Sequence, residues 1–215
     1  MPLFNKPFRA LIIGSTGTVG SALVSALESH PSCHEVIGLH RNSEPVIDYD
    51  HLETIQTAYE TLEKLRPFDL IINTIGVLHT QQWTPEKRLA DLQANQLQQQ
   101  FLSNAVGPAL TIKHFSKLMN PAGGVFATLS AKVGSITDNR LGGWYSYRAS
   151  KAALNMLIKT ASIELHRTQP HLVLVAIHPG TVKSNLSRPF RGDEIGRDPS
   201  AVSYTHLTLP TKRIV

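Results

Sequence analysis

The sequence predicts an α/β domain in which helices cover both faces of a doubly wound parallel sheet. Two observations lead to this fold class. Short apolar runs alternate with segments of helical apolar spacing, which is typical of βαβ units. A glycine-rich turn, Gly14–Gly20, joins the first apolar run to the first helical segment. The fold would bring the ends of all the strands to one edge, where a site is expected.

Each element is predicted from its apolar pattern and from the residues that bound it. Between the second strand and a brief third one, the link Arg41 to Pro45 leaves no room for a helix. A long helical segment is expected to break near Gly107 and Pro108, because proline lacks the amide donor. Strands are predicted at 9–13, 35–40, 46–48, 69–75, 125–130 and 172–177, and helices at 19–29, 52–65, 85–119 and 147–166.

Length and composition fit one soluble domain and argue against several classes of partner. Of the 215 residues, 41% are hydrophobic and 17% charged. A single cysteine, Cys33, excludes an internal disulfide and favours a reducing, cytoplasmic location. The apolar run at the start is too short for a signal peptide and no apolar run of 18 residues appears, so no membrane contact is predicted. The net charge of +5 comes without a basic run interleaved with aromatic residues, so no nucleic-acid partner is predicted. The ten histidines lack metal-ligand spacing, and no metal site is expected.

The end of the chain, residues 202–215, resembles the translation of a sequencing adapter, VSYTHLTLPT. We therefore expect the domain to comprise residues 1–201 and its sheet to be truncated at the C-terminal end. The alternative is an ordinary strand, because residues 202–209 are rich in β-branched and aromatic side chains.

The glycine-rich turn predicts a dinucleotide site of the Rossmann type. Glycines allow a tight turn and a close approach of the backbone to a pyrophosphate, and the following helix offers its positive N-terminal end. The residues expected to bind the cofactor here are Gly14, Ser15, Thr16, Gly17, Thr18, Val19 and Gly20.

Residues after the second predicted strand favour NADP over NAD. A ribose hydroxyl calls for a carboxylate at this position, and a 2′-phosphate calls for arginine. The chain has Arg41 there and no acid until Glu44. Asp48 could accept from the adenine amino group, although an aspartate in a turn is equally natural.

Tyr147 and Lys151 lie four residues apart on one predicted helix, so both side chains face the same way. A phenol has an ordinary pKa near 10. A neighbouring ammonium is expected to lower the Tyr147 pKa and make this phenol a proton donor or acceptor near neutral pH.

Six segments in order resemble the short-chain dehydrogenase/reductase family. They are the glycine turn, NTIG at 73–76, FLSNAVG at 101–107, LSAKVGS at 129–135, YSYRASK at 145–151 and HPGTVKS at 178–184. The region around Tyr147 is most similar to the C-factor-like branch of small carbonyl reductases. The glycine spacing is GxxGxxG, unlike the commonest family pattern GxxxGxG, so the turn geometry is expected to differ slightly.

The resemblance implies an NADP-dependent oxidoreductase that transfers hydride between the nicotinamide and a small carbonyl or alcohol. Tyr147 would be the general acid, Lys151 would hold the nicotinamide ribose, and Asn104 would bind a water that relays the proton. It also implies a homodimer or homotetramer. The remaining cofactor-binding positions implied are Asn73, Gly76, Pro179, Gly180, Val182 and Ser184.

One position departs from the family pattern. The serine that usually polarises the substrate carbonyl is replaced by Ala131, so Ser130 or Ser135 must supply the hydroxyl, or Tyr147 acts alone. Ser130 is the preferred candidate because it ends the strand nearest the predicted site. The departure also leaves open a nucleotide-binding signalling or sensor protein with little turnover.

Overall fold

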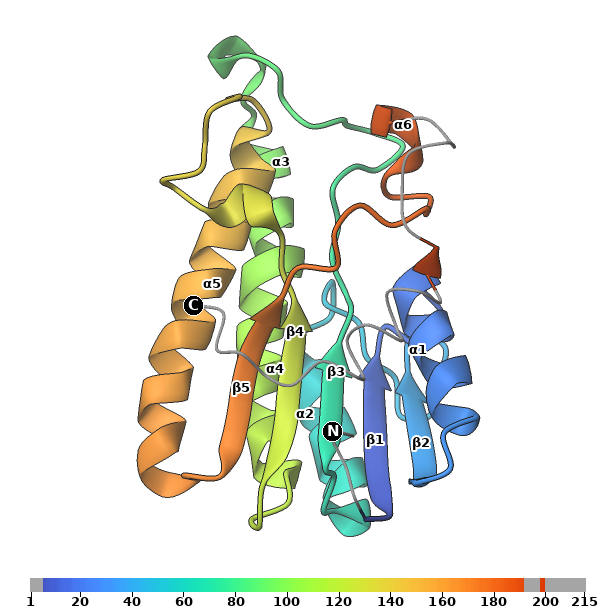
Figure 1. Cartoon of the computed structure of the whole chain (residues 1–215). Helices are drawn as coiled ribbons and strands as arrows, with labels where there is room; N and C mark the ends of the chain where they lie inside the picture. Colours follow the sequence, from blue (N-terminus) through green and yellow to red (C-terminus); the bar gives the residue numbers. More distant parts are fainter. Residues whose placement is uncertain (1–5, 192–197, 200–215) are drawn as a thin grey trace.

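Five parallel strands form the central sheet of this computed structural model, which describes residues 6–191 and 198–199 (Figure 1). The strand order is β2-β1-β3-β4-β5. The chain thus adds β2 on one side of β1 and then returns to add β3 on the other side. The strands are β1 (Phe8–Ile13), β2 (Cys33–Leu39), β3 (Leu70–Asn73), β4 (Gly124–Leu129) and β5 (Leu172–Ile177).

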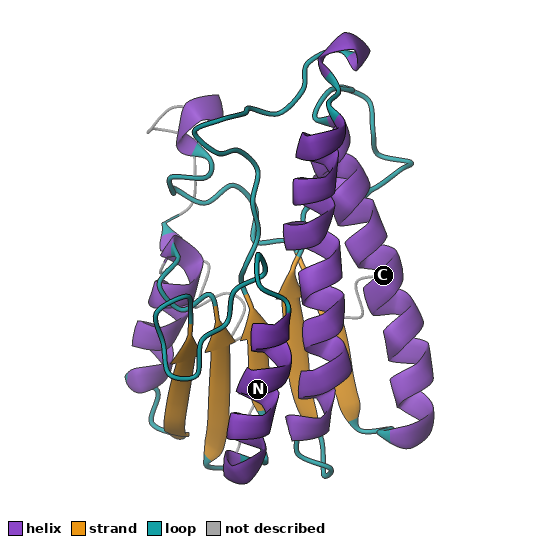
Figure 2. Cartoon of the chain, turned by 180° about the vertical axis from the view of Figure 1, so that it is seen from behind, coloured by secondary structure: helices purple, strands orange, loops and turns teal. Residues whose placement is uncertain are grey.

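Helices cover both faces of the sheet, which confirms the predicted doubly wound α/β class. On one face, Leu23 and Leu27 of α1 pack against β1 and β3. On the other, α2, α4 and α5 lie together over the strands (Figure 2). The helices are α1 (Thr18–Glu28), α2 (Glu53–Leu62), α3 (Ala94–Phe101), α4 (Gly107–Phe115), α5 (Tyr145–Thr168) and α6 (Arg188–Arg191).

The register of the strands brings their carboxyl ends to one edge of the sheet. Ile13 at the end of β1 pairs with Leu39 of β2 and with Asn73 of β3, and Leu129 of β4 pairs with Ile177 of β5. The segments that follow these residues include every stretch singled out as a cofactor-binding motif. The reversal of strand order between β1 and β3 is the place where such folds bind ligands.

The prediction of a short strand at 46–48 is wrong. Its amide groups bond to nearby loop atoms instead of a neighbouring strand: Ile47 N donates to the His40 carbonyl at 3.1 Å, and Asp48 N to Thr54 Oγ1 at 3.0 Å. Only an isolated bridge joins Asp48 to His51. Ile47 is fully buried, so the apolar pattern reflects a loop that enters the core.

The helix predicted at 85–119 begins later than expected and does not break at Pro108. Residues 85–93 form a loop with a short 3-10 turn, Leu89–Asp91, before α3. Between α3 and α4 the chain widens into a π-helical turn, Leu102–Val106, and Pro108 follows at the start of α4. The π-helical turn directly before Pro108 lets the helical run continue past a residue that has no amide to donate.

Gly107 has a packing role that the sequence did not indicate. A methyl group added there would lie 2.4 Å from the Tyr49 ring, which is 2% exposed. The Tyr49 hydroxyl bonds to Thr111 Oγ1 at 2.8 Å and accepts from Asn73 Nδ2 at 2.7 Å. Glycine therefore lets the ring lie flat against the helix and reach the end of β3.

The other predicted elements agree with the structure to within a few residues. The helix predicted at 52–65 is α2 continued by a 3-10 turn, Glu63–Leu65, and the one predicted at 147–166 is α5. The predicted tail, residues 202–215, lies outside the described residues. Of the helices within the described ranges, none has both the length and the apolar character needed to cross a membrane.

Replacing Gly107 by alanine should destabilise the protein because the new methyl group overlaps the Tyr49 ring. We expect the free energy of unfolding to fall by about 1–3 kcal/mol in urea titrations. The double variant Gly107→Ala, Tyr49→Leu should lose less than the sum of the two single changes. Equal stability of Gly107→Ala and the original protein would contradict this close packing.

Candidate active site

The two residues of the predicted chemistry lie on the buried side of α5. Tyr147 is 9% exposed and Lys151 is 3% exposed. Leu154 and Ile158 continue the same side of the helix into the core that α5 shares with β4 and β5. Spacings of three and four residues place all these side chains on one helical face. Leu154 and Ile158 form an apolar stripe that holds the helix against the sheet. This packing fixes the position of Tyr147 and Lys151 relative to the strands.

Lys151 ties α5 to the end of β4. Its Nζ donates a hydrogen bond of 3.0 Å to the Leu129 carbonyl oxygen and lies 5.9 Å from the centre of the Tyr147 ring. Burial disfavours the charged ammonium and lowers the pKa of Lys151 from 10.5 to about 8. The Lys151 side chain therefore stays cationic at neutral pH, although its pKa lies only slightly above that pH.

The pKa of Tyr147 is raised, contrary to the expectation from the sequence. Burial disfavours the phenolate and moves the pKa from 10.0 to about 12. The ammonium of Lys151 bonds to a backbone carbonyl, and burial is the cause that shifts the phenol pKa. The phenol is thus protonated at neutral pH in this structure.

Asn104 lies in the π-helical turn and clamps the loop after β3. Its Oδ1 accepts from Val77 N at 2.9 Å, and its Nδ2 donates to the Val77 carbonyl oxygen at 2.8 Å. The same Nδ2 lies 2.6 Å from Gln100 Oε1 and 3.2 Å from Ser150 Oγ. Gln100, one turn earlier, therefore helps to orient the amide of Asn104.

Gly76 lies where Asn104 and Lys151 meet. A methyl group at Gly76 would lie 3.2 Å from Asn104 Oδ1 and 3.4 Å from Lys151 Nζ. Three predicted site residues, from the loop after β3, the π-helical turn and α5, are therefore brought together. Tyr147 joins them through the first turn of α5, where Ser150 Oγ donates to the Tyr147 carbonyl oxygen at 2.9 Å.

The hydroxyl candidates that could replace Ala131 have different surroundings. Ser130 is buried, and its Oγ donates to Asn155 Oδ1, one turn beyond Lys151 on α5, at 2.6 Å. Ser135 Oγ accepts from Asp138 N at 3.2 Å in an exposed loop. Ser130 therefore lies beside α5, with its proton directed to an amide oxygen, and Ser135 is engaged within its own loop.

The glycine-rich turn has the geometry expected of a phosphate-binding loop. Gly14 has a φ of +84°, which favours glycine. A methyl group on Gly20 would lie 2.1 Å from the Gly14 carbonyl oxygen, so α1 can begin this close to the turn only with glycine there. The N-terminal end of α1, at Gly17, has no side-chain cap. Its first amides are therefore available to an anion.

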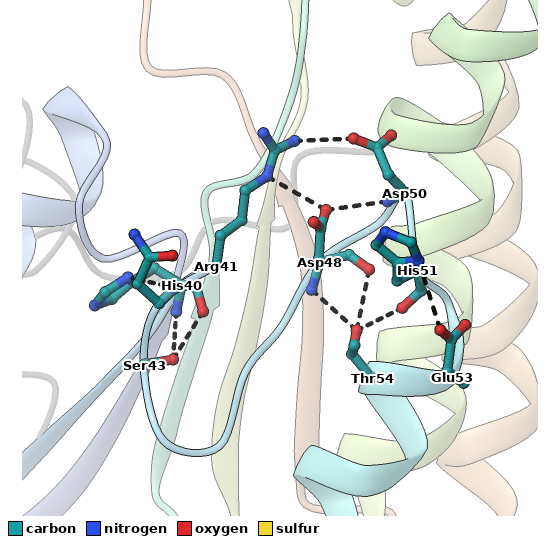
Figure 3. Close-up of polar contacts among 9 residues, drawn as sticks. His40, Arg41, Ser43, Asp48, Asp50, His51, Glu53 and Thr54 are labelled. Atoms are coloured by element: carbon teal, nitrogen blue, oxygen red, sulfur yellow. Dashed lines mark hydrogen bonds and ion pairs between the residues drawn. The ribbon is translucent and has the colours of Figure 1, made fainter.

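Arg41 is held by two carboxylates in the loop after β2 (Figure 3). Its Nε lies 3.3 Å from Asp48 Oδ1, and its Nη2 lies 3.2 Å from Asp50 Oδ2. The Arg41 side chain is 70% exposed. The residues predicted to read the 2′-phosphate and the adenine thus form one ion-paired group, which the sequence pattern did not indicate.

The remaining predicted cofactor residues lie at the same edge of the sheet. Asn73 Oδ1 accepts from Ile75 N at 3.1 Å at the end of β3. Gly180 has a φ of +77° in the turn after β5, and Val182 is buried beyond it. The loop is closed by Ser184, whose carbonyl oxygen accepts from Arg188 N at 3.0 Å; Pro179 precedes the turn.

Aromatic rings lie beside Tyr147. The Trp144 ring is 6.2 Å from the Tyr147 ring and 5.3 Å from the Phe190 ring of α6, and His79 is 5.4 Å from Phe190. All three distances are measured between ring centres. The contact of Trp144 with Phe190 joins the start of α5 to α6, and Figure 1 shows α6 above the carboxyl ends of the strands.

Residues 9–195 match the short chain dehydrogenase family. The chain belongs to this family. The match extends from β1 past α6, so it includes every predicted site residue. The predicted family resemblance is confirmed, and the chain is that of a short-chain dehydrogenase/reductase, whose members are NAD(P)-dependent oxidoreductases.

Two curated relatives and one solved structure show what this chain is similar to. The 1-hydroxy-2-glutathionyl-2-methyl-3-butene dehydrogenase of Rhodococcus sp. is 32% identical over 70% of this chain and 63% of its own length. The C-signal of Myxococcus xanthus is 34% identical over 57% of this chain and 70% of its own length. The NADPH-bound carbonyl reductase from chicken fatty liver superposes with a TM-score of 0.80 at 18% identity, covering 94% of this chain and 86% of that one.

The sequence pattern did not indicate several residues that bond to the predicted site residues. Tyr49, Gln100 and Asn155 bond to Asn73, Asn104 and Ser130 respectively. Only Gln100 carried a usable signal, its spacing of four from Asn104. The others bond to residues far away in the sequence. Glu86 is a further case: it is 3% exposed in a loop that was predicted to be part of a helix.

Replacing Lys151 by methionine should stabilise the protein near neutral pH in the absence of cofactor. The folded protein releases the Lys151 proton near pH 8 and the unfolded chain near 10.5. The free energy of unfolding should therefore rise between these values, by up to about 3 kcal/mol. Lys151→Met should abolish this rise and gain about 1–3 kcal/mol at pH 7.

The exposed Lys159 of the same helix provides the matched control. In urea titrations between pH 7 and pH 10, Lys159→Met should keep the rise in stability. The window stops there because the raised pKa of Tyr147 acts with opposite sign from about 10 to about 12. The same pH dependence in both variants would contradict the assignment to Lys151.

Proposed function

We propose that this chain is an NADP-dependent reductase of small carbonyl compounds that uses Tyr147, Lys151 and Asn104 as its proton relay. The observation that carries the proposal is the meeting of these side chains at the carboxyl edge of the sheet. Lys151 Nζ lies over the Tyr147 ring. A methyl group added to Gly76 would lie close to both Asn104 Oδ1 and Lys151 Nζ. The chain spans 63% of the length of the Rhodococcus relative, so the activity of the whole protein is part of the proposal.

The described residues fit a dinucleotide. The uncapped start of α1 would receive the pyrophosphate, with Gly14, Gly17 and Gly20 admitting it close to the backbone. Arg41 and Asp48 lie after β2, at the side expected for the adenosine. Asn73 and Gly76 would lie by the ribose. On the far side, Pro179, Gly180, Val182 and Ser184 would face the nicotinamide.

A bound reduced nicotinamide supplies a hydride to a carbonyl carbon. Tyr147 holds a proton at its phenolic oxygen at neutral pH and would donate it to the carbonyl oxygen as negative charge develops there. The ammonium of Lys151 would stabilise the phenolate left behind. Asn104 would orient a water that returns the proton.

Ser130 would be the second donor to the carbonyl only if its hydroxyl leaves Asn155. Loss of such a donor typically costs about 10²–10³ in rate, so a Tyr147-only site would be slow. A carbonyl beside Tyr147 would also meet the rings of Trp144 and Phe190, which favours substrates with an apolar or aromatic group. A homodimer or homotetramer remains a prediction.

The second candidate function is a nucleotide-binding sensor or signalling protein with little turnover. Two observations favour it: Ala131 replaces the usual serine, and the Ser130 proton is already directed to Asn155. The similarity to the C-signal of Myxococcus xanthus points the same way. Such a protein would bind NADPH without needing the phenol of Tyr147.

Replacing Tyr147 by phenylalanine should abolish carbonyl reduction because it removes the proton that the developing alkoxide requires. We expect kcat for NADPH oxidation with a panel of quinones and aldehydes to fall by about 10²–10⁴-fold. The Kd for NADPH should stay within about threefold. Turnover that survives this change would reject the catalytic assignment. NADPH binding without turnover in the unaltered protein would favour the sensor.

The proposed preference for NADPH over NADH can be tested at Arg41 and at the carboxylates of Asp48 and Asp50 that pair with it. Arg41→Ala should weaken NADPH by about 10–100-fold and NADH by much less, since a charge-assisted bond to the 2′-phosphate is lost. Asp50→Asn removes a competing carboxylate and should tighten NADPH by about two- to fivefold. Both effects can be read from cofactor titrations. Equal losses for the two cofactors in Arg41→Ala would overturn the preference.

A further inference from the structure

Glu86 is a buried carboxylate that none of the proposed steps uses. It lies in the loop before α3, and the structure leaves it 3% exposed. A carboxylate is seldom buried unless its oxygens are bonded, because the charge loses its hydration. Here both oxygens have partners on one residue sixty positions away: Ser146 Oγ donates to Oε1, and Ser146 N donates to Oε2 at 3.3 Å.

The partners of Glu86 lie at the first turn of α5. Trp144, the residue before the helix, has a φ of +53°, a left-handed conformation that is uncommon for a large side chain. Its amide donates to the Glu86 carbonyl oxygen at 2.5 Å. The helix has no side-chain cap at Trp144, so its first amides need acceptors from elsewhere. Glu86 therefore caps α5 from a distant loop with its side chain and its backbone.

The loop that carries Glu86 is itself fixed. Gln96 Nε2 of α3 donates to the Thr84 carbonyl oxygen at 3.0 Å. Gly143 approaches so closely that a methyl group on it would lie 3.4 Å from the Glu86 carbonyl oxygen. The basic side chain of Arg148, two residues beyond Ser146, donates to the carbonyl oxygens of Gly142 and Gly143. The loop that carries Glu86 is therefore held next to the N-terminal end of α5.

Tyr147 directly follows the capped residue. The described contacts of its ring are with Trp144 before it and with the ammonium of Lys151 after it. The position of the phenol therefore depends on the path of this first turn. A carboxylate at a helix N-terminus also favours the helical state through the dipole.

We propose that Glu86 is a positioning residue that caps the first turn of α5 and so fixes Trp144 and Tyr147 for proton transfer. The inference rests on the proposed function, and it assigns Glu86 no contact with substrate or cofactor. Removal of the cap would let the first turn fray and displace the phenol. Displacements of about 1 Å at a reacting group can cost about 10²-fold in rate.

Three variants separate positioning from general stability. Glu86→Ala removes every side-chain acceptor, whereas Glu86→Gln can still accept from Ser146 N and donate to Ser146 Oγ. Ser146→Ala removes only the hydroxyl partner. The matched control is Asp91→Ala, which removes the carboxylate that accepts from Arg88 N at 3.0 Å in the same loop, away from α5.

Kinetics are measured with NADPH and phenanthrenequinone on the full chain. For Glu86→Ala we expect kcat to fall by about 10–100-fold while the KM for NADPH stays within about twofold. Glu86→Gln and Ser146→Ala should stay within about fivefold of the original kcat, and Asp91→Ala should match it. An unchanged kcat in Glu86→Ala, or an equal loss in Glu86→Gln and Glu86→Ala, would overturn the proposal.

A second readout does not depend on turnover. The chain has two tryptophans, so a Trp83→Phe background leaves Trp144 as the only one. Acrylamide should quench Trp144 fluorescence more strongly in Glu86→Ala than in Glu86→Gln or Asp91→Ala. Unchanged quenching in Glu86→Ala overturns the cap. If the unaltered protein shows no Tyr147-dependent turnover, the proposed function fails, and the quenching still decides the role of Glu86.

Discussion

The hydrogen bond between the Lys151 ammonium and the Leu129 carbonyl oxygen connects α5, which carries Tyr147 and Lys151, to the central sheet. It joins the polar part of α5 to the last residue of β4, where the strand ends meet the loops. Burying an ammonium is costly, and the cost lowers the pKa of Lys151 to about 8. The apolar stripe below, through Leu154 and Ile158, holds the helix in place against this cost.

The pKa values of the pair follow from the same burial. The interior penalises both the ammonium and the phenolate, so the pKa of Lys151 is lowered and that of Tyr147 is raised. The resting site thus holds a protonated phenol beside a cation that is easily discharged. Negative charge created near Tyr147 is the event that would bring the two groups into stronger interaction, because charges attract more strongly away from water.

Local patterns predicted the elements that depend on near neighbours. The spacing of Tyr147 and Lys151 and the glycine turn before α1 required only chain geometry. The pattern failed where a segment was shaped by distant contacts. Residues 46–48 look like a strand because Ile47 is buried, but their amides bond to His40 and Thr54. The helix predicted from residue 85 begins only at Ala94, and Glu86 in the loop before it bonds to Ser146 of α5.

The site residues divide in the same way. The sequence by itself determined the family, the fold class and which side chains carry the proposed chemistry, since these follow from motif order and helical or strand periodicity. Only the tertiary structure decided their electrostatic state: the burial that raises the pKa of Tyr147, the two carboxylates on Arg41, and the amide that engages Ser130. Hydrogen bonding, ion pairing and desolvation depend on atoms that only folding brings together.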